Sequence, residues 1–361
     1  MDRLEIVQVT HTYPPYVGGL SHVTENLSKK LAKMGYEVTV LTLDVDGNLP
    51  RKEEVDGVKV KRFKGYAPFQ AYFCPSLSTI EYLRRAKADV IHVHNIGALL
   101  VPATWWAIKD RLQNLTYVVS PHHHRAGSKW HTKLLWKPYK PIASKTIKAA
   151  HAVHAVSNHE SKLIQKDFGV KPVMIPNGIA EDVLKCRWRR PSSKTVITYA
   201  GRLEKYKRVH KILEAAAMIK SVKSEITVRV IGQGPAEKQL LNLAKSLGVK
   251  IEHHKFLPRN EYLKLLSEST CFVNISKYEA FSIVTAEALS MGMPAVVAKP
   301  WGFHFVDAGS VELVDGESAG EIAIAVEKAI KNSSSSQQRS VNAFLSWDEV
   351  AKQIVTKIYC R

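Results

Sequence analysis

The chain has 361 residues, a length that favours two domains. Hydrophobic residues make up 45% and charged residues 24%, which excludes a disordered chain, a collagen and a small disulfide scaffold. The 52 basic residues exceed the 33 acidic ones, and the net charge is +19. This excess favours an anionic partner, but it does not choose among nucleic acid, a phosphorylated small molecule and an anionic membrane surface.

No membrane span or signal peptide is predicted. A span needs about 18 uninterrupted apolar residues, whereas the best candidate, Ala98–Ile108, is short and contains Pro102. Met1–Thr10 has the pattern of a strand, without a basic segment before an apolar one. The four cysteines lie far apart, which predicts free thiols in a reducing compartment. We therefore expect a cytoplasmic protein.

In the first half of the chain, apolar runs alternate with segments of helical spacing. Gly18-Gly19 predicts a turn before a helix that Gly35 ends. The last segment of this half leads into Asn177-Gly178. The predicted strands are Leu4–Thr10, Tyr36–Leu43, Asp89–His94, Tyr117–Ser120, Ala152–Val156 and Val173–Ile175.

After the polar, basic segment Lys185–Lys194 the same alternation starts again, and a last helix is predicted over Asp348–Ile358. Strands that alternate with helices predict parallel sheets with right-handed crossovers. We therefore expect an α/β protein of two doubly wound, Rossmann-like domains that face each other across a cleft. The predicted strands of the second half are Thr195–Ala200, Ile226–Ile231, Ile251–Phe256, Cys271–Asn274 and Pro294–Ala298.

Chemistry is expected at the carboxyl ends of these strands, where parallel sheets bind ligands. The loop Pro14–Leu20 follows the first strand, and its two glycines suit either an anion site at a helix start or a plain tight turn. Gly201-Arg202-Leu203 follows the strand Thr195–Ala200, and Lys207 lies five residues beyond Arg202. These two cations could clamp a diphosphate.

A second group of polar residues follows the strand Cys271–Asn274. If a helix begins near Ser282, Glu279 lies in the loop at its positive end and Glu287 on its second turn. Two carboxylates at the mouth of a cleft suit a ligand rich in hydroxyl groups. By contrast, Gly232-Gln233-Gly234 is only a weak dinucleotide signal, because Glu237 occupies the third glycine position.

This ordered set resembles the retaining glycosyltransferases of family 4, which have the GT-B architecture. The resemblance covers nearly the whole chain and rests on the order of its motifs. They are Pro14–Leu20 (glycine loop), Ser120-Pro121-His122, Ile175-Pro176-Asn177-Gly178-Ile179, Gly201-Arg202-Leu203 with Lys207, Glu279 to Glu287, and Ala288–Pro294.

The resemblance implies a role for each part of the chain. Residues 1–180 would form the acceptor-side domain and 181–340 the nucleotide-sugar domain, while 341–361 would form a helix that packs back toward the first domain. The implied roles by residue are as follows: Arg202 and Lys207 hold the donor diphosphate, Gly18 and Gly19 close over it, Glu287 binds the nucleotide ribose, Glu279 faces the transferred sugar with the backbone N–H groups of Phe281, Ser282 and Ile283, and His122 lies beside the reacting centre.

The implied reaction moves a sugar from a UDP- or GDP-linked donor to a hydroxyl group with retention of configuration, without a metal or other cofactor. Four residues depart from the family pattern. Arg208, Ala280 and Ser282 replace usual glycines, and Trp301 stands in place of a smaller residue. These departures put the identity of the donor sugar in doubt.

Two patterns could instead indicate a metal. Asp44-Val45-Asp46 matches the metal motif of the other major glycosyltransferase fold, although a turn after a strand is the favoured interpretation. His122-His123-His124 and the pair His92 and His94 lack further ligands at a telling spacing. We expect His92 and His94 to be hydrogen-bonded core residues.

The segment from Arg111 to Asn158 contains eight lysines and arginines but no acidic residue. Lys129, Lys133 and Lys137 would share one helical face, near Trp130, Leu134 and Trp136. The sequence fits two interpretations equally: Arg125–Lys148 docks on an anionic membrane, with the protein peripheral on its inner face, or it is a solvated basic face.

Two other functions fit parts of the sequence. A sugar-nucleotide epimerase or a phosphorylase could share the same architecture, and product analysis would separate them from a transferase. A basic nucleic-acid-binding protein is the less favoured alternative, because no recognisable module is present and aromatic residues are only 8%. We therefore expect no nucleic-acid partner.

Overall fold

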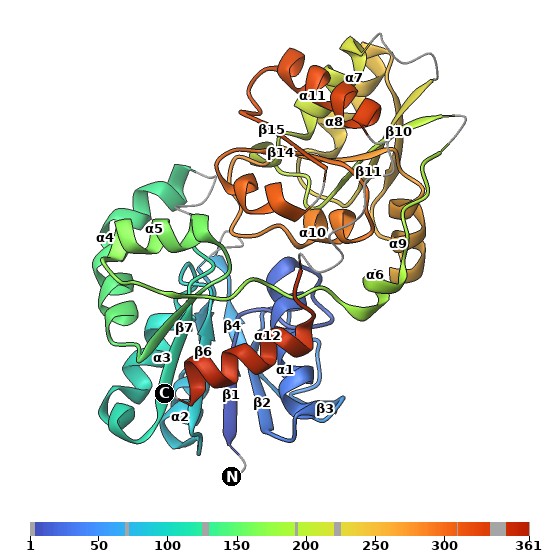
Figure 1. Cartoon of the computed structure of the whole chain (residues 1–361). Coiled ribbons are helices and arrows are strands. Elements are labelled where there is room, and N and C mark those ends of the chain that lie inside the picture. Colours follow the sequence, from blue (N-terminus) through green and yellow to red (C-terminus); the bar gives the residue numbers. More distant parts are fainter. Residues whose placement is uncertain are drawn as a thin grey trace. The chain divides into compact units, whose positions relative to one another are not determined.

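The computed structural model describes residues 4–68, 72–124, 130–191, 194–219, 225–308, 310–332 and 344–360, with the backbone alone for 130–133 and 308 (Figure 1). The chain forms two compact units. Unit 1 comprises Met1–Gly178 and Leu345–Arg361, and unit 2 comprises Ile179–Phe344. Each unit is a mostly parallel sheet with helices packed against it, so the predicted α/β class with two Rossmann-like domains is confirmed.

The sheet of unit 1 has the strand order β3-β4-β2-β1-β6-β7-β8-β9. All neighbours on this path are parallel except β3 and β4, and β5 adds a second antiparallel pair with β4. Buried Val, Ile and Leu side chains fill its central strands, as expected for a sheet covered on both faces. The strands are β1 (Glu5–Val9), β2 (Glu37–Asp44), β3 (Lys52–Val55), β4 (Val58–Tyr66), β5 (Cys74–Pro75), β6 (Val90–His94), β7 (Thr116–Ser120), β8 (Ala152–Ala155) and β9 (Val173–Met174).

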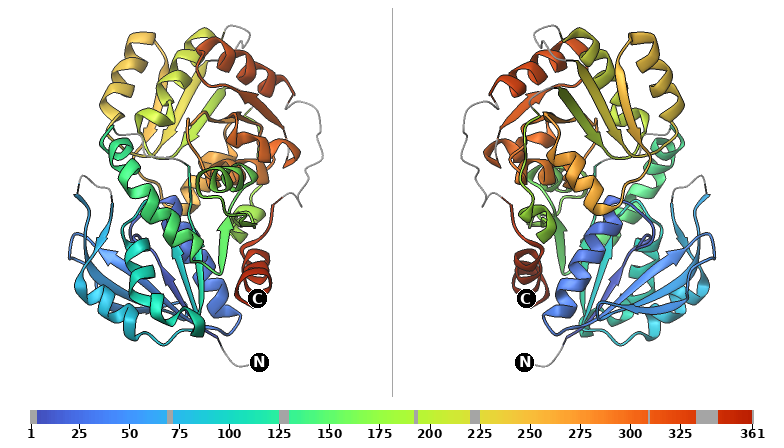
Figure 2. Two further views of the ribbon diagram at one scale, coloured as in Figure 1. Left: turned by 90° about the vertical axis from the view of Figure 1, so that its left-hand side faces the viewer. Right: turned by 90° about the vertical axis from the view of Figure 1, so that its right-hand side faces the viewer.

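The helices of unit 1 include a segment that returns from the end of the chain. The last α-helix, α12, packs against α1, and the two lie side by side in Figures 1 and 2. Helices α2 and α3 contact each other, as do α3 and α4. The helices are α1 (Gly19–Lys33), α2 (Leu77–Arg85), α3 (Leu100–Ile108), the 3-10 helix η2 (Lys109–Asn114), α4 (Trp130–Lys148), α5 (Asn158–Phe168), α12 (Trp347–Ile354) and the π turn η5 (Val355–Tyr359).

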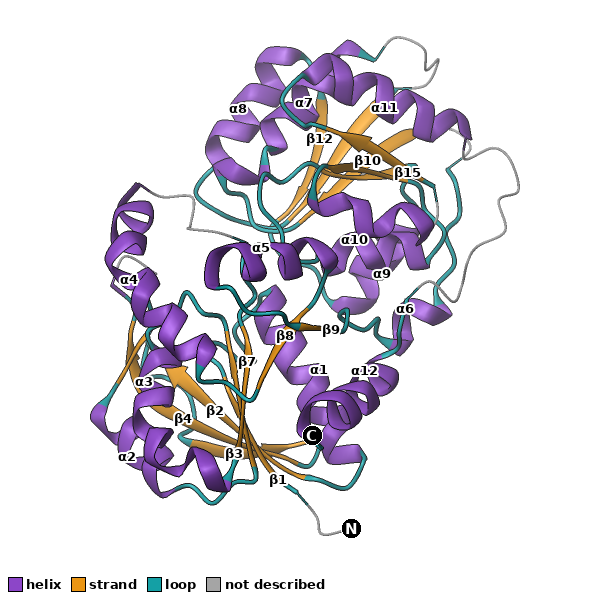
Figure 3. Cartoon of the chain, turned by 60° about the vertical axis from the view of Figure 1, so that its left-hand side comes forward, coloured by secondary structure: helices purple, strands orange, loops and turns teal. Residues whose placement is uncertain are grey.

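Unit 2 has a fully parallel sheet in the order β12-β11-β10-β13-β14-β15. Figure 3 shows α7, α8 and α11 on one face of this sheet and α9 and α10 on the other. Its strands are β10 (Thr195–Ala200), β11 (Ile226–Ile231), β12 (Lys250–His254), β13 (Cys271–Asn274), β14 (Ala295–Ala298) and β15 (Val311–Val314). Its helices are α6 (Glu181–Lys185), η3 (Lys205–Lys207), α7 (Val209–Met218), α8 (Glu237–Leu247), α9 (Arg259–Ser267), α10 (Ile283–Ser290), η4 (Trp301–Ala308) and α11 (Ala319–Asn332).

Every predicted strand is present, and the described residues form four further strands that the sequence did not predict. Strands β3 and β4 form a hairpin whose turn is Asp56-Gly57, both with positive φ. The charged residues of β3 suit its place at the edge of the sheet, and β4, beside it, alternates buried and exposed residues. Strand β15 is short and only partly buried, and β5 spans two residues.

Candidate active site

The polar residues of unit 2 gather at the point of its sheet where the order of strand addition reverses. From β10 the chain adds β11 and β12 on one side, whereas β13 pairs with β10 on the other side and leads to β14 and β15. Ligands of open parallel sheets bind outside the carboxyl ends of the strands at such a switch point. Arg202 and Lys207 follow β10, and Glu279 follows β13. Because these neighbouring strands are parallel, the three residues come to the same carboxyl end of the sheet.

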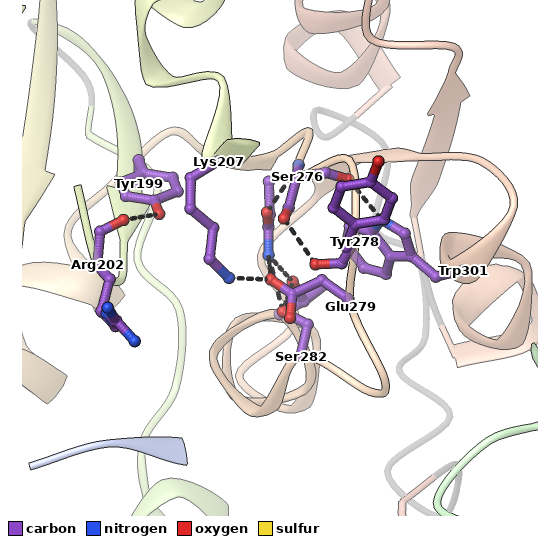
Figure 4. Close-up of polar contacts among 10 residues, drawn as sticks. Tyr199, Arg202, Lys207, Ser276, Tyr278, Glu279, Ser282 and Trp301 are labelled. Atoms are coloured by element: carbon purple, nitrogen blue, oxygen red, sulfur yellow. Dashed lines mark hydrogen bonds and ion pairs between the residues drawn. The ribbon is translucent and has the colours of Figure 1, made fainter. Parts of the chain in front are cut away.

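Lys207 and Glu279 form the centre of this cluster. The Lys207 Nζ lies 2.5 Å from the Glu279 Oε1, and the two side chains are 14% and 16% exposed (Figure 4). Burial alone would lower the pKa of Lys207, but the charge of Glu279 outweighs it and the pKa is raised. The pair therefore keeps a half-buried ammonium group charged at the end of β10.

Arg202 has a different environment from Lys207. Its side chain is 69% exposed and forms an ion pair with Glu204. Its backbone carbonyl accepts a hydrogen bond of 2.9 Å from the Tyr199 hydroxyl (Figure 4). The predicted clamp therefore consists of one cation fixed by its neighbours and one that reaches into solvent.

The loop that carries Glu279 is held by side chains of its own. Ser276 donates from its hydroxyl to the Tyr278 carbonyl at 2.9 Å, and Trp301 Nε1 donates to the Ser276 carbonyl at 2.7 Å (Figure 4). The buried Trp301, at a position where the resemblance implies a smaller residue, thus anchors this loop. Asn274 donates to the Ser282 hydroxyl at 2.8 Å and closes the loop at its far end.

Arg208 and Ser282, which replace usual glycines, share one backbone property. Their φ angles are 57° and 71°, in the left-handed region that favours glycine. Each gains a side-chain contact in return: Arg208 forms an ion pair with Glu317, and Ser282 hydrogen-bonds Asn274 and Thr285. The departures therefore keep the conformation that glycine adopts readily.

The positive end of α10 lies next to Glu279 in the chain, as predicted. The helix begins at Ile283, and its first N–H groups have no partner within the helix. Phe281, just before it, is buried and stacks on His304 with ring centroids 5.1 Å apart. A helix start of this kind attracts anions and hydroxyl oxygens.

Glu287 lies on the second turn of α10, as predicted, but sequence reasoning missed its partners. Its side chain is 3% exposed, and its Oε1 lies 2.8 Å from Arg259 Nη1. Its Oε2 accepts a hydrogen bond of 2.8 Å from the Tyr262 hydroxyl. Arg259 also binds Asp182, and these two carboxylates raise the pKa of Arg259 although burial alone would lower it. No spacing signal links α9 to Glu287.

The glycines singled out in the two units differ in what surrounds them. A Cβ on Gly232 would lie 2.0 Å from the Gly201 carbonyl oxygen, and one on Gly234 would lie 2.5 Å from the Leu203 carbonyl oxygen. This close backbone approach explains both glycines without a dinucleotide. Gly18 and Gly19, at the start of α1, have no atom within 4 Å of such a Cβ. Packing within unit 1 therefore does not require glycine at either position.

The sheet of unit 1 has its own switch point, between β1 and β6. Gly18 and Gly19 follow β1, and His122 follows β7, the next strand along. His122 has a φ of 47°, and its Nε2 lies 3.3 Å from the His94 Nδ1. Burial lowers the pKa of His122 to about 3, so the ring is neutral near pH 7. His92 and His94 are buried and hydrogen-bonded, which confirms that prediction.

The residues that could have indicated a metal have structural partners. Asp44 accepts hydrogen bonds from the backbone N–H groups of Gly47 and Leu49, both at 2.9 Å, as a turn residue does. The Tyr16 hydroxyl lies within hydrogen-bond distance of both Asp44, at 3.2 Å, and Asp46, at 3.0 Å. In the part of the chain that the structure describes, no group of three His, Cys, Asp or Glu side chains is placed to hold a metal ion.

Only part of the basic segment Arg125–Lys148 can be described. Arg125, Lys129 and the side chains of Trp130 and Lys133 lie outside the described residues. On the rest of α4, Lys137 is exposed, as are Leu134, Leu135 and Ile142. Trp136 does not join them, because it packs on the core and stacks on His123. The prediction that Trp136 contributes to the basic surface is therefore wrong. None of the described helices is both long and apolar enough to cross a membrane.

Comparison with known proteins gives the same architecture. Relatives include the GDP-mannose:cellobiosyl-diphosphopolyprenol alpha-mannosyltransferase of Komagataeibacter xylinus, 24% identical over 82% of this chain and 76% of that protein. The sucrose-phosphate synthase of Thermosynechococcus elongatus superposes with a TM-score of 0.75 at 16% identity, over 98% of this chain and 95% of the other. The Anabaena protein HepE, solved in complex with UDP and glucose, superposes with a TM-score of 0.68 at 15% identity, over 99% and 95%.

The family models divide the chain close to the boundary between its two compact units. The model described as Glycosyltransferase Family 4 matches residues 17–183. The model described as Glycosyl transferases group 1 matches residues 182–345, which include the Lys207–Glu279 cluster. The chain therefore belongs to the family 4 glycosyltransferases, enzymes with the GT-B architecture.

Proposed function

We propose that this glycosyltransferase transfers a hexose from a UDP- or GDP-linked donor to a hydroxyl acceptor with retention of the anomeric configuration. The observation that carries the proposal is the Lys207–Glu279 pair at the switch point of unit 2, beside the start of α10. A cation and free helix N–H groups suit a diphosphate, and a carboxylate suits sugar hydroxyls. The two nucleotides proposed for the donor are supported by similar proteins, one named for GDP-mannose and one solved with UDP.

In this proposal each residue has one task. Lys207 and the exposed Arg202 hold the diphosphate, and Gly18 and Gly19 close over it, as the family resemblance implies. Glu287 binds the ribose, Glu279 binds the transferred sugar together with the N–H groups of Phe281, Ser282 and Ile283, and His122 acts beside the reacting carbon. No metal or other cofactor is needed, because cations and helix ends stabilise the leaving group.

The proposed chemistry is a displacement on one face of the sugar. The bond between the anomeric carbon and the diphosphate oxygen breaks, and a bond to the acceptor oxygen forms on the same side. The acceptor proton passes to the departing phosphate oxygen, so the charges balance without a covalent enzyme intermediate. Lys207 and Arg202 stabilise the negative charge that develops on the diphosphate.

Thermal-shift titration with a panel of nucleotide sugars tests the donor assignment. A UDP- or GDP-linked hexose should raise the melting temperature, because a ligand that binds only the folded state stabilises it. The proposal fails if neither class binds. Product analysis then separates a transferase from an epimerase, which leaves the sugar on its nucleotide, and from a phosphorylase, which consumes phosphate.

We also propose that the acceptor is lipid-linked and that Arg125–Lys148 docks on an anionic membrane surface. Exposed Leu134, Leu135 and Ile142 accompany the exposed Lys137 on α4. The name of one relative specifies a diphosphopolyprenol acceptor. Each lysine near such a membrane contributes about 1 kcal/mol at low salt, which gives weak, reversible attachment.

Co-sedimentation with anionic and neutral vesicles tests this docking. Wild-type protein should bind anionic vesicles only, and glutamine at Lys129, Lys133 and Lys137 together should abolish binding, as should high salt. A matched triple variant at exposed lysines of unit 2 removes the same charge: Lys238, Lys245 and Lys264. Equal loss in both variants, or no binding by wild type, contradicts the docking proposal.

A further inference from the structure

The core of unit 1 contains a continuous chain of buried polar side chains that ends at His122. It runs through Gln8 on β1, His92 and His94 on β6, Ser120 on β7 and His154 on β8. Tyr359, in the π turn after α12, joins it from the far end of the sequence. All of these side chains except His122 are more than nine-tenths buried. Buried polar groups of this kind need complete hydrogen bonding.

The direction of the hydrogen bonds follows from one end of the chain. The His154 Nε2 lies 2.8 Å from the Ile175 carbonyl, which can only accept, so Nε2 carries the proton. Burial lowers the pKa of His154 to about 4, so the ring is neutral and its Nδ1 accepts from the Ser120 hydroxyl at 2.8 Å. Ser120 has no second proton, so it accepts from the His92 Nε2 at 2.7 Å.

The remaining bonds have the same direction. The His92 Nδ1 accepts from the Tyr359 hydroxyl at 2.8 Å, and that hydroxyl accepts from the Gln8 Nε2 at 2.9 Å. The Gln8 Oε1 then accepts from the His94 Nε2 at 2.7 Å. The His94 Nδ1 is left to accept from the His122 Nε2 at 3.3 Å. Each group uses its donor once, so the assignment is consistent from end to end.

We propose that Tyr359 is a positioning residue for His122: through Gln8 and His94 it holds the His122 ring in the tautomer with the proton on Nε2. The unprotonated Nδ1 is then the nitrogen that can accept a hydrogen bond from a substrate hydroxyl and so orient it. This inference deepens the proposed function, because it assigns the acceptor atom of the histidine placed beside the reacting carbon.

The Tyr359 hydroxyl is decisive because it fixes the Gln8 amide. While Tyr359 donates to His92, it can only accept from Gln8, so the Gln8 oxygen must face His94. Without the hydroxyl, the amide can rotate and present its NH₂ group to His94. The His94 ring would then change its protonated nitrogen, and His122 would follow. Phenylalanine at 359 therefore keeps the ring in the core but removes the direction of the bonds.

Nitrogen-15 NMR of the imidazole rings tests the tautomers directly in the ligand-free, full-length protein. In wild type, His122 should show a protonated Nε2 and an unprotonated Nδ1, with the same pattern at His92, His94 and His154. Signals are assigned from single His→Gln variants. A His122 ring that is charged, or protonated on Nδ1, overturns the proposal without any variant.

The Tyr359→Phe variant supplies the second test. We expect mixed tautomers at His94 and His122 and a loss in kcat of roughly tenfold, the size expected for one lost hydrogen bond, with an unchanged donor KM. Ile358→Val, at a buried neighbour in the same turn, is the control for loss of packing, and it should leave the tautomers unchanged. A loss of kcat with wild-type tautomers, or altered tautomers with unchanged kcat, overturns the positioning role.

The two proposals can fail separately. The NMR pattern requires no donor or acceptor, so it can hold in a protein that transfers no sugar. Conversely, active enzyme with a different tautomer at His122 removes the Tyr359 inference and leaves the proposed function intact.

Discussion

Replacing Lys207 by alanine should weaken the binding of nucleoside diphosphates. A hydrogen bond to a charged group is worth about 1.5–3 kcal/mol, which corresponds to roughly a 10- to 150-fold loss of affinity. Lys207 is only 14% exposed and already holds its ammonium group at Glu279, so it loses little conformational freedom when a phosphate arrives. We therefore expect the loss to reach the upper part of this range.

Glutamine at Glu279 should have the opposite effect on the same ligand. In the ligand-free structure Glu279 competes for the Lys207 ammonium at 2.5 Å, and its negative charge repels a diphosphate. The Glu279→Gln variant should therefore bind UDP or GDP at least as tightly as wild type. Transfer should still fall, because the carboxylate proposed to bind the sugar is lost.

Isothermal titration calorimetry with UDP and GDP measures both effects. Lys205→Ala is the matched control, because Lys205 is exposed in the same turn, η3. Thermal melting of each variant checks that it is folded. If Lys207→Ala and Glu279→Gln change the affinity in the same direction, or if neither differs from Lys205→Ala, the pair is structural and the diphosphate site lies elsewhere.

Three further predictions concern the glycine loop, acid stability and metals. Gly19→Ala should raise the free energy of unfolding by about 0.4–1 kcal/mol in chemical denaturation, because its Cβ meets no atom within 4 Å. The same Cβ should lower the affinity for the donor, measured by calorimetry, because it approaches the diphosphate. Unchanged affinity would show that the loop is remote from the donor. Unit 1 should unfold in acid before unit 2, because burial lowers the pKa of its core histidines. This contribution to the free energy of unfolding of unit 1 is fully present above the unfolded histidine pKa near 6.5. Below that pH it decreases by about 1.4 kcal/mol for each histidine and each unit that the pH is lowered. Hydrogen exchange at about pH 5 checks this order, and earlier loss of protection in unit 2 contradicts it. Transfer should persist in excess EDTA. Complete loss of transfer that manganese restores would contradict this and favour a metal site at Asp44 and Asp46.

Much of the architecture was predictable because burial leaves a strong pattern. Continuous runs such as Thr195–Ala200 and Cys271–Asn274 are parallel strands covered on both faces, and the structure has them at those bounds. The two candidate clusters of unit 2 were also predictable, because their residues follow strands that end at one edge of a sheet. The helix start after Ser282 followed from the same pattern.

What escaped prediction depends on contacts between distant segments. Arg259 reaches Glu287 from a different helix, and Tyr359 reaches Gln8 across nearly the whole sequence. No local spacing encodes either contact. The left-handed backbone at Arg208 and Ser282 was hidden for another reason: the residue types do not show it, and only the conformation explains why glycine is usual there.

The central claim is retaining transfer from a nucleotide sugar, and proton NMR of the first product tests it most directly. The enzyme is incubated with the UDP- or GDP-linked hexose that gives the largest thermal shift, and the anomeric proton of the transferred or hydrolysed sugar is followed before mutarotation. The account predicts that an α-linked donor gives an α product while the anomeric-proton signal of the donor disappears. A β product would contradict same-face displacement, and an unchanged donor would contradict transfer itself.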